Sequence, residues 1–149
     1  RDLCQAVYGG PPARWDDASD IYDRVAKDPD LLLTAPATPY LPVIARLPVV
    51  YVLSCQPQSW RDQARQWLGA NLKTKHSTIF VNRQEQKLSF LACGDWLVDD
   101  YPGFEDYSQI ALVSYPYNQD ITFPGYRINS PAGLQEFLDD ESGGCACEV

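Results

Sequence analysis

The run Val49-Val50-Tyr51-Val52-Leu53, which ends at Ser54, decides the fold class of this chain. A continuous apolar run rich in β-branched residues is typical of a strand that is buried on both faces of a parallel sheet. Further apolar runs of this kind occupy residues 78–81, 96–98, 110–113 and 126–128. Helical patterns alternate with these runs, so we expect an α/β fold with a three-layer, Rossmann-like parallel sheet.

The helical patterns lie in the connections between the runs. An apolar stripe at helical spacing predicts a helix over residues 59–69, capped by Ser59 and closed by Gly69. A further short helix is expected over residues 84–91. Ser130-Pro131 is typical of a helix start, and it predicts a last helix that runs through Leu138. Residues 28–42 are rich in proline and predict a connection with at most short helical turns.

The composition sets limits on the function. The chain has 149 residues, about one domain, with 12 Lys and Arg against 20 Asp and Glu and a net charge of −8. This charge argues against binding to a nucleic-acid polymer, and no apolar run is long enough to span a membrane. The five cysteines show no disulfide spacing and favour free thiols in a reducing, cytoplasmic compartment. Because the sequence starts at Arg1 and contains no Met, we expect the natural N-terminus to lie upstream or to have been removed.

Polar side chains follow four of the apolar runs. The runs end in Ser54, Asn82, the pair Asp99-Asp100 and Ser114. Ligands of parallel α/β sheets bind beyond the carboxyl ends of the strands. The sequence therefore predicts that the polar chemistry lies at one edge of the sheet.

Three of these features can act together on a phosphorylated ligand. The Ser54 hydroxyl, with backbone N–H groups of the loop that follows, can hold a phosphate oxygen. Lys87 can neutralise charge on a transferring phosphoryl group, and Asp99 and Asp100 offer the hard oxygen ligands that Mg²⁺ prefers. We therefore take Ser54 and Lys87 as candidate catalytic and phosphate-binding residues, and Asp99 and Asp100 as candidate metal ligands.

Each feature also has a purely structural interpretation. A Ser after a strand is usually a cap, a lone Lys is usually a solvated charge, and adjacent Asp residues often form a turn. His76 is expected in a loop, and Cys145 and Cys147 alone are a weak signal for a soft metal. A response-regulator receiver uses similar residues, but there the Lys follows the acidic pair, whereas here Lys87 precedes it.

Residues 94–102, Gly-Asp-Trp-Leu-Val-Asp-Asp-Tyr-Pro, are similar to the G-D-x-L-I-D-D-x-P segment of 5′(3′)-deoxyribonucleotidases. Residues 111–118 resemble the strand and P-Y-N segment that follow it in that family. Together with the order of Ser54, Lys87 and Asp99-Asp100, the chain resembles the haloacid dehalogenase (HAD) superfamily of phosphohydrolases over most of residues 13–138. The nearest resemblance is to the nucleotidases and the related bacterial and phage nucleotidase-like proteins.

The resemblance implies an HAD-like domain over residues 1–138, with a short cap or linker at 9–40, and an acidic, disordered tail at 139–149. Ser54 would match motif II, Lys87 motif III, and Asp99 with Asp100 motif IV. The implied activity is hydrolysis of a small phosphomonoester, such as a (deoxy)nucleoside monophosphate, through an aspartyl-phosphate with Mg²⁺ bound.

The D-x-D nucleophile motif of that family is absent from this sequence. In the family it ends the first, central strand, between the strands that end in motifs II and IV, so we expect it just upstream of Arg1. Without that strand, two parallel strands would face a gap with unpaired backbone groups. We expect the upstream chain, or a partner or second copy, to complete the sheet. The alternative is a catalytically inactive HAD-like module that serves as a structural or interaction subunit, for example in a viral or phage assembly.

Overall fold

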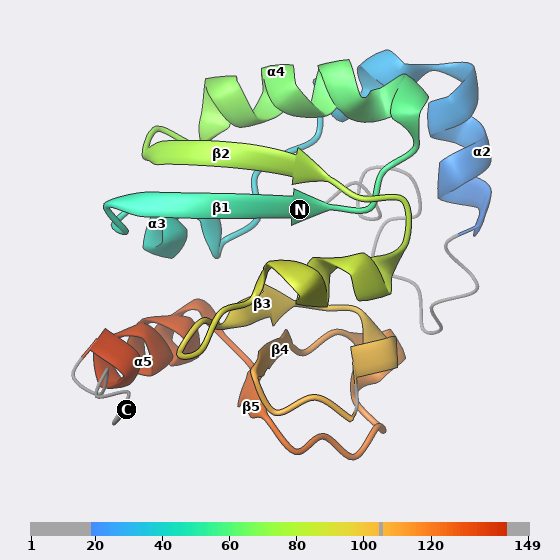
Figure 1. Cartoon of the computed structure of the whole chain (residues 1–149). Coiled ribbons are helices and arrows are strands. Elements are labelled where there is room, and N and C mark those ends of the chain that lie inside the picture. Colours follow the sequence, from blue (N-terminus) through green and yellow to red (C-terminus); the bar gives the residue numbers. More distant parts are fainter. Residues whose placement is uncertain (1–18, 105, 143–149) are drawn as a thin grey trace.

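The structure is a computed structural model, and it describes residues 19–104 and 106–142. All strand pairs in these residues are parallel, as the sequence predicts, and they form two sheets (Figure 1). The smaller sheet pairs β1 (Val49–Ser54) with β2 (Lys75–Phe80), and the larger has the order β3 (Leu97–Asp99), β4 (Ile110–Val113), β5 (Tyr126–Ile128). Observed strands and predicted runs agree closely for β1, β4 and β5, whereas β2 begins three residues before the predicted run.

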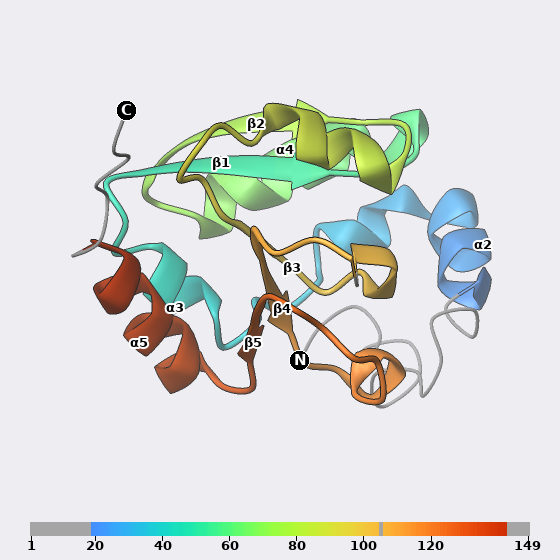
Figure 2. The same cartoon turned by 60° about the horizontal axis from the view of Figure 1, so that its bottom comes forward.

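The described part of the chain has a break in the sheet where the sequence predicts that a strand is missing. No ladder joins β1 to β3 within residues 19–104 and 106–142, so each is an edge strand of its own sheet. The arrows of β1 and β3 point the same way in Figure 1, and Figure 2 shows the helical segment that follows β2 alongside β1 and not in the space between β1 and β3. The break therefore falls between the strand that ends at Ser54 and the strand that ends at Asp99.

The prediction that the first run is buried on both faces is wrong. Val49 is 46% exposed and Tyr51 is 70% exposed, although Leu53 on the same face is half-buried. Their partners on β2, Lys75 and Ser77, are exposed as well, so this part of one face of the smaller sheet is uncovered in the described structure. By contrast, all four residues of β4 are buried, because β4 lies between β3 and β5.

The core forms on the two faces of β4. Side chains of successive strand residues point to opposite faces, so Ala111 and Val113 join one cluster and Ile110 and Leu112 join the other. The first cluster is covered by α3 (Leu41–Ile44) and α5 (Pro131–Ser142), through Val43, Leu134 and Phe137. The second cluster includes Leu53 of β1 and Leu88, so side-chain packing rather than backbone pairing connects the two sheets.

The helix that follows β1 covers the smaller sheet. A 3-10 turn, η3 (Gln58–Trp60), leads into α4 (Arg61–Asn71), and the guanidinium groups of Arg61 and Arg65 lie 5.3 and 4.8 Å from the ring centre of Phe80. Ser59 lies inside η3 and is not the helix cap. Gly69 does not end the helix, because it lacks the positive φ of a left-handed C-cap.

The ends of the described chain are helical. The segment before β1 contains α2 (Ser19–Lys27), η2 (Pro29–Leu32) and α3, which confirms the short helical turns expected in the proline-rich stretch. Helix α5 runs through Ser142, so residues 139–142 belong to the helix and not to a disordered tail. The first part of the expected cap and linker, residues 9–18, lies outside the described residues, and so do Cys145 and Cys147. Among the residues described, no helix has the length and apolar character needed to cross a membrane.

Candidate functional site

Lys87 and Asp99 form a buried ion pair. Lys87 lies in the 3-10 helix η4 (Gln84–Phe90), which replaces the α-helix expected there, and its Nζ is 2.7 Å from Oδ2 of Asp99. Each of the two side chains is 8% exposed. The start of η4 is fixed by the Gln86 side chain, whose Oε1 accepts hydrogen bonds from the backbone N–H groups of Asn82 and Arg83. The structure therefore brings together two of the candidate residues that are 12 positions apart in sequence.

Both carboxylate oxygens of Asp99 are engaged. While Oδ2 accepts from Lys87, Oδ1 accepts from the backbone N–H groups of Asp100 and Tyr101, each at 2.9 Å. These bonds form a local turn directly after β3. Asp99 is thus well placed to orient the Lys87 ammonium group, and it has little capacity left for a metal ion.

Asp100 has a different environment from that of Asp99. Burial raises the pKa of the Asp100 carboxyl group, and the neighbouring charge of Asp99 raises it further, while the Tyr117 hydroxyl and the Lys87 ammonium group lower it. Tyr117 belongs to η6 (Pro116–Asn118), after β4, and donates a hydrogen bond to Oδ2 of Asp100. The net effect is a raised pKa, so the ionised form of Asp100 is less favoured in the fold than in water, chiefly because the group is buried.

Asn118 holds the ends of β3 and β4 together. Its side chain is fully buried, and Nδ2 donates to the backbone carbonyls of Asp100 and Val113 at 2.9 and 2.8 Å. Its Oδ1 accepts from the backbone N–H of Tyr115. This amide fixes the backbone of Asp100 and, through η6, the position of Tyr117.

The donor set is compatible with Mg²⁺ as an open site. No group of three or more His, Cys, Asp or Glu side chains gathers within residues 19–104 and 106–142. Mg²⁺ commonly uses one or two carboxylates and completes its shell with waters and substrate phosphate oxygens. Because both oxygens of Asp99 are already hydrogen-bonded, Asp100 would be the carboxylate ligand of such a site.

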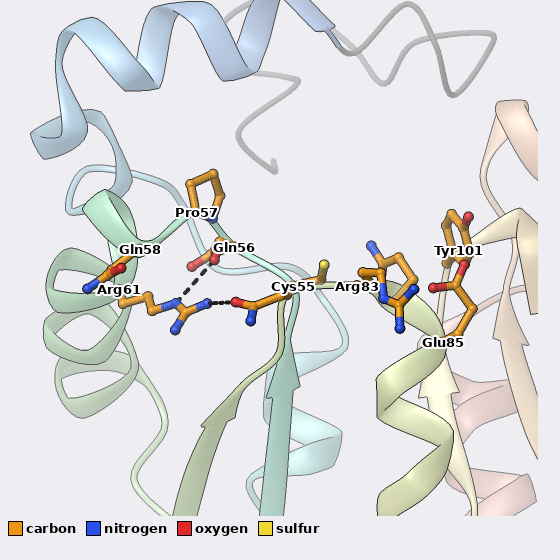
Figure 3. Close-up of a pocket in the computed structure, with 10 residues that line it drawn as sticks. Cys55, Gln56, Pro57, Gln58, Arg61, Arg83, Glu85 and Tyr101 are labelled. Atoms are coloured by element: carbon orange, nitrogen blue, oxygen red, sulfur yellow. Dashed lines mark hydrogen bonds between the residues drawn. The ribbon is translucent and has the colours of Figure 1, made fainter.

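A cavity of about 540 Å³ opens at the carboxyl ends of β1, β2 and β3 (Figure 3). Its walls come from the segment that follows Ser54, from the turn that leads to Lys87 and from the residue two positions after Asp99. The lining residues are Cys55, Gln56, Pro57, Gln58, Arg61, Asn82, Arg83, Gln84, Glu85 and Tyr101. The cavity adjoins the chain segments that carry the candidate residues, but none of the four candidates lines it: Ser54, Lys87, Asp99 and Asp100. Ser54 is the last residue of β1, directly before the lining segment.

Tyr101 and Glu85 lie side by side on one flank of the cavity (Figure 3). Burial raises the pKa of the Tyr101 hydroxyl, and the negative charge of Glu85 raises it further.

Two further residues of the predicted polar edge have structural roles. Asn82 accepts a hydrogen bond of 2.9 Å from Nη2 of Arg61, whose Nε also donates to the carbonyl of Gln56 (Figure 3). The Ser114 hydroxyl donates to Oδ1 of Asn129 at 2.6 Å. Asn82 therefore helps to shape the cavity wall, whereas Ser114 belongs to the turn between β4 and β5.

Sequence reasoning did not assign roles to Tyr117, Asn118, Gln56 or Gln84. The first two could have been found from their place directly after a fully buried run, where the other polar residues of the site also lie. Gln56 and Gln84 carry no such signal in the sequence, because the feature that distinguishes them is the burial of their Oε1 atoms in the folded chain. No family model, curated protein or solved structure matches this chain.

Proposed function

We propose that this chain carries the phosphate-binding and metal-binding side of an HAD-like phosphoric monoester hydrolase that uses Mg²⁺. Its substrate is a small phosphomonoester, such as a (deoxy)nucleoside monophosphate. The observation that carries the proposal is the buried Lys87–Asp99 pair beside Asp100, at the carboxyl end of β3 and next to an open cavity. A buried ammonium group at such a place suits the negative charge of a phosphoryl group.

Each candidate residue has one role in the proposal. Asp99 orients the Lys87 ammonium group, which neutralises the phosphoryl oxygens, and the Ser54 hydroxyl donates to one of those oxygens. Asp100, held by Tyr117 and Asn118, would be the carboxylate ligand of the metal. When bound, Mg²⁺ supplies charge neutralisation for the phosphate.

The nucleophile would come from a strand placed between β1 and β3. An Asp at the end of that strand would attack phosphorus, and the leaving alkoxide would take a proton from a neighbouring acid. Water would then release phosphate and restore the Asp. The break between the two sheets supports this part of the proposal, because the unpaired edges of β1 and β3 are parallel and lie on either side of it.

A second candidate is a catalytically inactive module of the same fold that binds a partner. It is favoured by the absence of a D-x-D motif after any apolar run in this sequence and by the exposed β1 residues Val49 and Tyr51. A partner strand, or a second copy of the chain, would then complete the sheet.

Phosphate binding distinguishes the two candidates. The full-length protein would be titrated with inorganic phosphate, with and without Mg²⁺, by isothermal titration calorimetry. The hydrolase proposal expects binding that Mg²⁺ strengthens and that Lys87→Met abolishes. Arg65→Met, which removes an exposed cation on α4, should leave binding unchanged. An absence of binding under both conditions would favour the inactive module.

A further inference from the structure

The segment between β4 and β5, residues 114–125, supplies two side chains that hold Asp100. Tyr117 donates a hydrogen bond to its carboxylate, and the Asn118 amide donates one to its backbone carbonyl. Apart from the three residues of η6, residues 114–125 form no helix or strand. Ordering such a segment costs conformational entropy, so contacts from outside it must hold it in one conformation. The position of Asp100 therefore depends on what orders this segment.

Arg127 of β5 holds the segment at three points. Its Nη1 donates hydrogen bonds of 3.2 Å to Oγ of Ser114 and to the backbone carbonyl of Asn118. Its Nη2 donates one of 3.0 Å to the backbone carbonyl of Ile121. The planar guanidinium group carries its N–H donors in a fixed arrangement, so one side chain can fix several acceptors relative to one another. Arg127 thus joins the beginning, the middle and the end of residues 114–121.

The half-buried Arg127 side chain directs its donors to this one segment. Within residues 19–104 and 106–142 it forms no ion pair, and the ion pairs there join Arg65 to Asp62 and Lys87 to Asp99. Arg127 therefore does not serve to neutralise a neighbouring carboxylate. Its hydrogen bonds stabilise the conformation of the segment that follows β4.

We propose that Arg127 is a positioning residue that keeps the Tyr117 hydroxyl on the carboxylate of Asp100. It does so by holding the backbone carbonyl of Asn118, the residue next to Tyr117 in η6. The inference rests on the proposed function, in which Asp100 is the carboxylate ligand of Mg²⁺. Loss of a hydrogen-bond partner of a ligating carboxylate typically weakens metal binding by about 10- to 100-fold. Arg127 lies one step further from the metal, so its loss should have a smaller effect.

The test is a double-mutant cycle on the affinity of the full-length protein for Mg²⁺ alone, measured by isothermal titration calorimetry. Tyr117→Phe removes the hydroxyl, and Arg127→Lys keeps the positive charge but loses the planar group that reaches three acceptors. We expect Tyr117→Phe to weaken Mg²⁺ binding by about tenfold and Arg127→Lys by about three- to tenfold. The double variant should lose less affinity than the product of the two single losses, because Arg127 acts through the position of Tyr117.

Ser114→Ala provides a milder variant for the same cycle. It removes one of the three acceptors and leaves Arg127 in place, so it keeps the test open if Arg127→Lys does not fold. It should show the same coupling with Tyr117→Phe in the affinity for Mg²⁺. Arg46→Lys is the matched control, since its exposed guanidinium group bonds to Gln135 of α5 and not to residues 114–125. It should leave the affinity unchanged.

The cycle separates positioning from a general loss of stability, which would not couple the two sites in the affinity for Mg²⁺. An unchanged affinity in Arg127→Lys would overturn the inference and leave the proposed metal site standing. Single losses that simply multiply in the double variant would do the same. If the wild type binds no Mg²⁺, the metal site of the proposed function fails and the inference fails with it.

Discussion

The Tyr117 hydroxyl donates a hydrogen bond to the Asp100 carboxylate and so joins the chain after β4 to the chain after β3. The bond lowers the pKa of Asp100, but burial and the charge of Asp99 raise that pKa by more. The site therefore contains a carboxyl group that loses its proton less readily in the folded protein than in the unfolded chain. This difference makes the stability of the protein depend on pH.

Asp100→Asn should stabilise the metal-free protein at neutral pH. Because the folded-state pKa lies above the ordinary value of 3.8, the favourable contribution of Asp100 is full below that value and is lost as pH rises through the folded pKa. The unfolding free energy of the variant should therefore exceed that of the wild type at about pH 7, and the difference should vanish near about pH 3. Urea unfolding at a series of pH values checks this. A variant that is less stable at neutral pH would contradict it.

Mg²⁺ should raise the thermal midpoint of the wild type and not that of Asp100→Asn. A cation that binds only the folded state stabilises it by mass action, by about 2.7 kcal/mol at a hundred times its Kd. Differential scanning calorimetry with and without Mg²⁺ measures the shift. Asp120→Asn, at an exposed carboxylate after η6, should keep the wild-type response. An unchanged shift in Asp100→Asn would remove Asp100 from the metal site.

Lys87→Met should destabilise the protein by about 3–5 kcal/mol, because it leaves the buried Asp99 carboxylate without its partner cation. Denaturant unfolding measures the loss. The exposed pair of Arg65 and Asp62 provides the comparison, with side chains 56% and 85% exposed, and Arg65→Met should cost less than about 1 kcal/mol. Similar losses for both variants would show that the Lys87–Asp99 pair is not buried in solution.

Backbone amides of β1 should report whether the sheet is completed. With β2 as the only paired neighbour, N–H groups of residues 49–54 that point away from β2 should exchange rapidly, while those of β4 exchange slowly. If a strand fills the space between β1 and β3 in the full-length protein, all amides of residues 49–54 should be protected. Hydrogen exchange followed by NMR distinguishes these states. Rapid exchange of the outward-facing amides in the full-length protein would contradict a completed sheet.

The sequence was sufficient to predict the parallel strands and the end of the sheet that carries the polar residues. Apolar runs identified β1, β4 and β5 almost to the residue, because burial of a strand leaves a continuous apolar pattern. The same apolar pattern predicts more burial for β1 than the structure shows. An apolar sequence shows that a strand can be buried, but it does not show which neighbouring elements cover it. Tyr51, 70% exposed, is the clearest example.

The contact between Lys87 and Asp99 joins two residues that the sequence makes conspicuous, because charged residues next to apolar runs are rare, and the structure pairs them. The position of Asn118 after a fully buried run marks it in the sequence, but that position does not show which groups its amide bonds. Its hydrogen bonds emerge only when distant segments pack together.

The most direct test of the phosphate-site proposal is phosphate release by the full-length protein from a panel of phosphomonoesters, with and without Mg²⁺. The account predicts release that requires Mg²⁺ and that is lost in Lys87→Met but retained in Arg65→Met. Failure to release phosphate from any ester, although an Asp-x-Asp motif ends the strand that completes the sheet, would contradict it.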